Sequence, residues 1–71
     1  MPKMQVNPSQ VRADLRCYYR VPFLSRPGFQ YVDCQVIGWE SSHKGQLTTV
    51  ILEPRDGRKG FITTVPRNLY F

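Results

Sequence analysis

The chain has 71 residues, of which 41% are hydrophobic and 21% charged, and its net charge is +5. This length leaves room for one domain with a thin core, and the composition excludes wholesale disorder. No segment approaches the ~18 apolar residues of a membrane span, and no apolar run follows Met1-Pro2-Lys3 to make a signal peptide, so we expect a cytoplasmic protein. The positive charge indicates either simple solubility or a polyanionic partner.

Residues 1–12 show no strand pattern and are expected to form an N-terminal tail, which is loose over residues 1–6. Asn7 suits the N-cap of a helical turn, because Pro8 takes the first helical position and Gln10 completes a capping box. We therefore expect one or two helical turns before the first strand.

Two alternating segments follow and predict two half-buried strands, at residues 13–22 and 29–42. On the first, one face carries Leu15, Cys17, Tyr19 and Val21, and the other carries Asp14, Arg16, Tyr18 and Arg20. On the second, one face carries Val32, Cys34 and Val36, and the other carries Tyr31, Asp33, Gln35 and Ile37. Gly38 indicates a bulge or a close backbone approach, and a bulge would redirect Trp39.

The clearest pattern is a hairpin in which strands at residues 46–53 and 58–65 flank a turn at residues 54–57. A single turn at Pro66-Arg67-Asn68 and a last short apolar strand complete the chain. Five short strands at close spacing predict an all-β fold, a five-stranded small barrel over residues 13–71.

The two cysteines, Cys17 and Cys34, lie in alternating strands without metal-binding spacing. We expect both to be reduced, buried, small hydrophobic residues. A disulfide between neighbouring strands is the alternative.

The order of a long first loop, three meandering strands, a single helical turn and a short fifth strand resembles the Src-homology-3-like small barrel. The segment Gly60-Phe61 through Pro66-Arg67-Asn68-Leu69-Tyr70 is similar to the glycine–aromatic–Pro–x–Asn–Tyr ending of those domains. Residues 31–69 also look Tudor-like. These resemblances imply a binding domain, whose ligand is a proline-rich peptide in the first family and a methylated side chain in the second.

A narrower resemblance links Gln35-Val36-Ile37-Gly38-Trp39 to the Gln-Ile-Val-Gly-Trp strand of the plasmid-borne type II dihydrofolate reductases. Those enzymes hold substrate and cofactor with a Val-Gln-Ile-Tyr motif. The matching place reads Phe61-Ile62-Thr63-Thr64, which lacks the glutamine and the tyrosine. This resemblance therefore implies a shared fold only.

Catalysis is not expected, because the chain does not offer convergent acid–base groups. His43, the only histidine, falls in a polar loop without an orienting partner nearby, and the five acidic residues are scattered. A glycine-rich phosphate loop is absent as well. We expect no enzyme, no cofactor and no metal.

The basic residues favour nucleic acid as the partner, DNA or RNA, because arginine interleaved with aromatic rings suits phosphates and bases. Three of them crowd the hairpin tip, one follows the next strand, and two flank a tyrosine on the first strand. The predicted contacts are Arg55, Arg58, Lys59, Arg67, Arg16 and Arg20, with Tyr18 or Trp39 as the stacking ring. The plainer interpretation is that these residues are exposed surface charges, which discourage aggregation between strands and bind no ligand.

An adaptor or inhibitor that docks to a protein, or to a second copy of this chain, is the alternative function. It would use an apolar patch formed by Tyr31, Ile37 and Trp39 if these three side chains share the outer face. The direction in which Trp39 points is open at this stage.

Overall fold

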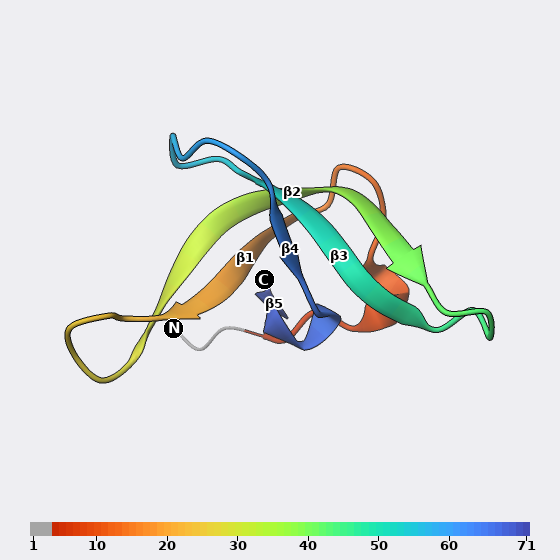
Figure 1. Cartoon of the computed structure of the whole chain (residues 1–71), viewed down its shortest axis with the longest axis horizontal. Coiled ribbons are helices and arrows are strands. Elements are labelled where there is room, and N and C mark those ends of the chain that lie inside the picture. Colours follow the sequence, from red (N-terminus) through yellow and green to blue (C-terminus); the bar gives the residue numbers. More distant parts are fainter. Residues whose placement is uncertain (1–3) are drawn as a thin grey trace.

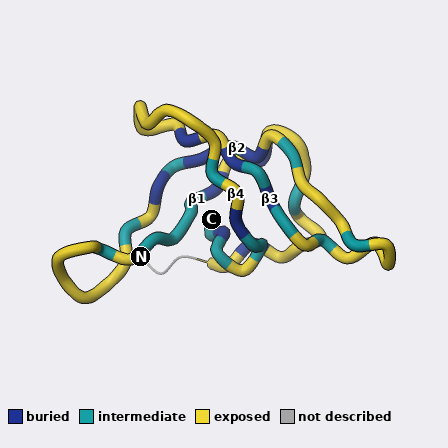
Figure 2. Tube along the Cα trace, in the orientation of Figure 1, coloured by how far each residue is buried: buried dark blue, intermediate teal, exposed yellow. Residues whose placement is uncertain are grey.

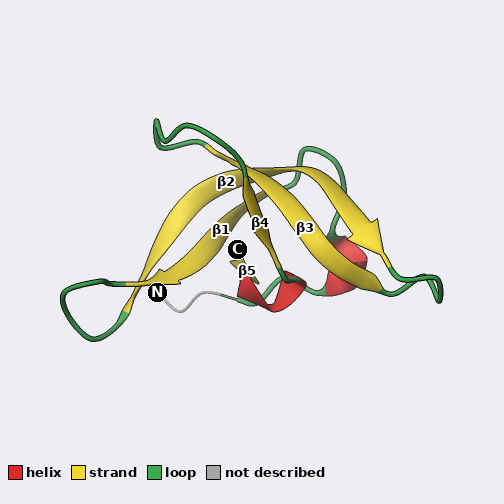
Figure 3. Cartoon of the chain, in the orientation of Figure 1, coloured by secondary structure: helices red, strands yellow, loops and turns green. Residues whose placement is uncertain are grey.

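The computed structural model of the chain describes residues 4–71 (Figure 1). Five strands form one antiparallel sheet in the order β4–β3–β2–β1–β5. They are β1 (Arg16–Pro22), β2 (Phe29–Ser41), β3 (Leu47–Pro54), β4 (Ile62–Thr64) and β5 (Leu69–Tyr70). Helical structure in the described part of the chain is limited to two single turns of 3-10 helix, η1 (Pro8–Gln10) and η2 (Pro66–Asn68) (Figure 3). The all-β, five-stranded prediction is confirmed, while the strand pairing leaves the sheet open.

The core lies on one face of the curved sheet, where the alternating apolar residues of the long strands meet (Figure 2). Its buried members are Val6, Leu15, Cys17, Val32, Cys34, Val36, Val50, Leu52 and Leu69. Tyr19 and Val21 pack against it while half-buried. The inward faces that the sequence predicts for the first two strands are therefore confirmed, and the other faces of both strands point outward. The first strand begins at Arg16 and not at residue 13, because Asp14 lies in a turn with a φ of 68°.

β2 changes partners along its length, and a bulge marks the change. Its first part pairs with β1 as far as Gln35, and its second part continues with β3 alone. The register passes from Val36–Leu52 to Gly38–Ile51, which leaves Ile37 as an extra residue. Gly38 thus marks a bulge, the first of the two predicted alternatives.

β4 is shorter than predicted, because residues 58–61 belong to a loop and only Ile62–Thr64 is a strand. Gly57 and Gly60 have φ angles of 94° and 91°, and this left-handed conformation interrupts an extended strand. Asp56 accepts a hydrogen bond from the backbone N–H of Arg58 at 3.1 Å, which holds the loop in a tight turn. The turn predicted at 54–57 is therefore the start of a longer loop at residues 55–61.

The predicted loose tail is wrong for residues 4–6, which line the free edge of β5. Val6 is 2% exposed, and its N–H donates to the carbonyl oxygen of Leu69 at 2.9 Å. Phe71 N–H donates to the carbonyl oxygen of Met4 at 2.8 Å, and Gln5 stands opposite Tyr70. Residues 1–3 of that prediction lie outside the described residues.

The predicted capping box at η1 is confirmed. The backbone N–H of Asn7 donates to Oε1 of Gln10 at 2.8 Å, and that of Ser9 donates to Oδ1 of Asn7 at 3.0 Å. The turn stops after three residues, and Val11 already has an extended backbone. η1 therefore joins the edge segment to β1 without adding a helix to the core.

Replacing Val6 by alanine is expected to lower the free energy of unfolding by about 1–2 kcal/mol, because two buried methyl groups are lost and a small cavity is left. Urea unfolding followed by circular dichroism measures this change. Val11→Ala is the matched control, since Val11 is only half-buried, and its loss should be smaller. Equal, small losses in both variants would show that residues 4–6 do not belong to the core.

Candidate functional site

The outward face of β1 has neighbours on both sides, because β1 lies between β2 and β5 in the sheet. Arg20 stands opposite Tyr31 of β2, and Tyr18 stands opposite Tyr70 of β5. Side chains directly opposite in an antiparallel pair project from the same face of the sheet. The sheet therefore brings together aromatic residues that are 52 positions apart in the sequence, at 18 and 70.

Arg20 is held between two aromatic rings on this face. Its guanidinium carbon lies 4.6 Å from the ring centroid of Phe29 and 5.2 Å from that of Tyr70. The rings of Tyr31 and Tyr70 meet edge to face, with centroids 5.6 Å apart and an interplanar angle of 83°. We call Tyr18, Arg20, Phe29, Tyr31 and Tyr70 the arginine–aromatic cluster.

The cluster combines a positive charge with accessible ring surface. Phe29 is 50% exposed and Tyr31 39% exposed, while Arg20 and Tyr70 are half-buried. A guanidinium over a ring face gains cation–π energy and can still donate hydrogen bonds from its edge. Within residues 4–71, Arg20 forms no ion pair with an acidic side chain. Its charge is therefore free of a fixed carboxylate partner in the described chain.

Polar contacts extend the outward face from the cluster toward the 55–61 loop. Arg16 forms an ion pair with Asp33, with Nη2 and Oδ2 2.9 Å apart. Arg55 donates from Nη1 to Oε1 of Gln35 at 2.8 Å, and Gln35 in turn donates to Oδ1 of Asp14 at 2.9 Å. These contacts lie at the surface and contribute little to stability. They do fix the positions of two arginines.

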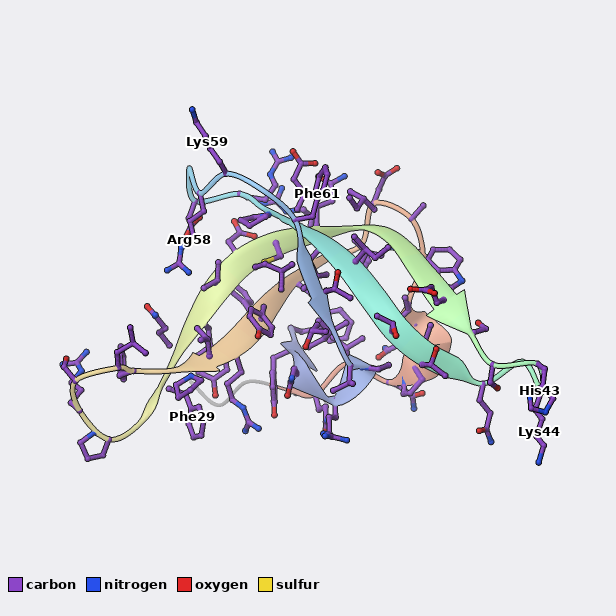
Figure 4. The ribbon with its side chains drawn as sticks, in the orientation of Figure 1. Phe29, His43, Lys44, Arg58, Lys59 and Phe61 are labelled. Carbon is purple, nitrogen blue, oxygen red and sulfur yellow. The ribbon has the colours of Figure 1, made fainter. Side chains whose placement is uncertain are left out.

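The remaining predicted basic contacts lie away from the cluster. Figure 4 shows Arg58 and Lys59 on the 55–61 loop in the upper part of the view, whereas Phe29 lies in the lower part. Arg58 is paired with Asp56, with Nε and Oδ2 3.0 Å apart. Arg67 lies in η2 and lines a hollow of about 350 Å³ together with residues 5–8 and Pro66. The predicted basic surface is therefore divided between a strand face, a loop and a separate turn.

The structure does not gather Tyr31, Ile37 and Trp39 into one patch. Trp39 stands opposite Val50, a buried core residue, so the bulge turns its side chain toward the core face. It is nevertheless 45% exposed, because it lies near the end of the sheet. Ile37 faces outward but is six residues from Tyr31, about 20 Å along an extended strand. Asp33 and Gln35 lie between them.

Three members of the cluster are absent from the predicted nucleic acid contacts. Phe29 and Tyr70 belong to neither predicted set of contacts, and Tyr31 was predicted only for the alternative protein-docking patch. Their outward direction follows from the alternation of β2 and β5. Their position beside Arg20 follows from the register of β1 with both neighbours. Alternation was visible in the sequence, whereas the register was not.

The two cysteines stand directly opposite each other on β1 and β2, on the core face. Both are free and buried, as predicted. Burial raises the pKa of each thiol from 9.0 to about 11, and the neighbouring Cys34 and Asp33 add to the effect at Cys17. Inert, protonated thiols are the consequence.

The described residues offer little else for chemistry. Over residues 4–71, no group of three or more His, Cys, Asp and Glu side chains is placed to hold a metal ion. His43 is exposed beside Lys44 in the loop after β2, at the far end of the molecule (Figure 4). No helix in this part of the chain has the length and apolar character needed to cross a membrane.

No protein family, curated protein or solved structure matches the chain. The resemblances to Src-homology-3-like, Tudor-like and type II dihydrofolate reductase proteins therefore stay predictions. The fold and the site define a small all-β chain with a cation–aromatic surface on one side of its sheet.

Proposed function

We propose that the chain is a non-catalytic module that binds nucleic acid through the arginine–aromatic cluster. The observation that carries the proposal is the position of Arg20 between the rings of Phe29 and Tyr70 on an exposed sheet face. A guanidinium in this setting can donate to a phosphate while neighbouring rings contact a base or sugar.

The charges of the chain support the same partner. The net charge is +5, and an excess of positive charge suits a polyanionic partner such as nucleic acid. Arg16 and Arg55 continue the outward face, while Arg58 and Lys59 provide further contacts for a longer ligand. Because two of these arginines already have acidic partners, we expect moderate, salt-sensitive affinity.

We also infer a Src-homology-3-type relationship for the fold. The supporting features are the pairing of β1 with both β2 and β5 and the single 3-10 turn directly before β5. Because domains of this type bind many kinds of ligand, the fold relationship does not identify the partner of this chain. The choice depends on the cluster.

Docking to a protein is the competing function. The patch proposed for it needs Ile37 and Trp39 on one face, and the bulge turns them to opposite faces. Each then presents a single exposed apolar side chain, which is normal on a protein surface. The nucleic acid proposal is therefore the better supported of the two.

Replacing Arg20 by glutamine tests the proposal. We expect the Kd for a labelled oligonucleotide to rise about tenfold, because a charge-assisted contact is lost. The slope of log K against log salt concentration should fall by about 1 in magnitude. Fluorescence anisotropy at several salt concentrations measures both quantities.

Two control variants carry the same loss of charge. Arg26 lies in the loop before β2 with its guanidinium carbon 4.0 Å from the ring centroid of Phe23, so Arg26→Gln removes a similar cation–ring contact. Lys44→Gln removes a charge at the far end of the molecule (Figure 4). Losses in either control as large as in Arg20→Gln would mean that the affinity reflects overall charge, and the cluster would lose its assigned role.

A further inference from the structure

We infer that the ligand of the arginine–aromatic cluster is single-stranded nucleic acid, whose unpaired bases stack on Phe29 and Tyr31. This inference rests on the proposed function and specifies its ligand. It follows from the balance of rings and charges on the outward face, from the accessibility of those rings and from the secondary structure that surrounds them.

The cluster is rich in rings and poor in charge. It holds four aromatic rings and one cation, Arg20. The next arginine along β1, Arg16, is already 2.9 Å from the carboxylate of Asp33. Duplex binding depends mainly on many phosphate contacts, whereas stacking contributes much of the affinity for single strands. The composition of this face therefore favours a single strand.

The rings are positioned so that a base can reach them. Half of the surface of Phe29 is exposed, although Arg20 covers part of its ring. Tyr31 is 39% exposed, and its edge-to-face contact with Tyr70 fixes its orientation. Rings held in place by neighbours lose little conformational freedom when a base stacks on them. In a duplex the faces of the bases are covered by their neighbours, and such stacking is excluded.

Secondary structure points the same way. The major groove of a duplex is read most often by an α-helix, and the described residues contain only two single 3-10 turns. The outward face of a sheet is instead a platform for splayed bases. From Arg16 to Arg20 the strand covers about 13 Å, and the 55–61 loop extends the path, so a short oligonucleotide is a suitable probe.

The test compares one mixed-sequence 12-nucleotide strand, alone and annealed to its complement, as DNA and as RNA. We expect the single strand to bind about tenfold more tightly than the duplex. Phe29→Leu should weaken single-strand binding about tenfold and leave the salt slope unchanged, because it removes stacking and no charge. Trp39→Leu is the matched control, since Trp39 is 45% exposed and the bulge turns its side chain to the other face of the sheet.

The outcomes separate this inference from the function on which it rests. The single-strand inference would be overturned if the duplex bound as tightly as the single strand and Phe29→Leu bound with the same affinity as wild type. Nucleic acid binding by the cluster would still be upheld in that case if Arg20→Gln weakened binding. Equal losses in Phe29→Leu and Trp39→Leu would also overturn the single-strand inference. An absence of binding to every probe at low salt would overturn both proposals. Thermal unfolding of each variant confirms that binding differences do not reflect unfolding.

Discussion

Replacing Leu52 by alanine is expected to lower the free energy of unfolding by about 3 kcal/mol, the largest effect of any truncation proposed for this chain. Leu52 is 0% exposed in the middle of β3, opposite Val36 on one side and Ile62 on the other. Alanine at this position loses the transfer energy of a buried side chain and leaves a cavity that neighbouring strands cannot close. A domain of this size has a stability of only about 4–10 kcal/mol, so a large share of it would be lost.

The expected change is visible in two measurements. The midpoint of thermal unfolding should fall by about 15 °C, and the midpoint of urea unfolding should fall with an unchanged m-value. Leu24→Ala is the matched control, because Leu24 is fully exposed in the loop between β1 and β2, at 103%. Similar stability of the two variants would contradict the position of Leu52 in the core.

The identity of the strands was predictable because it depends on local patterns. Alternation assigned the inward faces of β1 and β2, and the β-branched runs on either side of the turn at Pro54–Gly57 indicated β3 and β4. The length of β4 was less accessible. Gly60 has a φ of 91°, which the sequence does not show, and because of this angle β4 begins only at Ile62.

The burial of Val6 was not predictable from the same patterns. The first six residues are too few to show an alternating pattern. The hydrogen bonds of residues 4–6 are made with Leu69 and Phe71 at the other end of the chain. Segments that line an edge are stabilised by such distant contacts. Such long-range contacts cannot be predicted from composition or periodicity.

The candidate site was predicted in part, and the missing part is the register. The sequence placed Arg20 beside Tyr18 on one strand and assigned Tyr31 to another patch with Trp39. Pairing of β1 with β2 sets Arg20 opposite Tyr31, and pairing with β5 adds Tyr70. The bulge at Ile37 and Gly38 then separates Trp39 from this face. A one-residue shift in either strand pairing would move part of these side chains to the other face of the sheet, and the cluster would not form.

The stability of the fold should decrease between pH 9 and pH 11 because of the two opposed thiols. Cys17 and Cys34 are 2% and 0% exposed, and burial raises the pKa of each from 9.0 to about 11 in the folded state. In this range the unfolded chain releases thiol protons that the folded chain keeps. The contribution of the protonated thiols to the free energy of unfolding is therefore complete below pH 9 and is lost as the pH rises through 11. At pH 10 the loss is about 1 kcal/mol for each thiol.

Urea unfolding at pH 8 and pH 10 under reducing conditions measures this loss. Tyrosines and lysines also titrate in this range, so the decisive quantity is the difference between wild type and the variant Cys17→Ala/Cys34→Ala. We expect the decrease in stability from pH 8 to pH 10 to be about 2 kcal/mol smaller in the double variant. If that variant is too unstable to measure, Cys34→Ala should remove about half of the difference. The same pH dependence in wild type and variants would mean that the thiols titrate normally, and a buried pair on the core face of β1 and β2 would then be wrong.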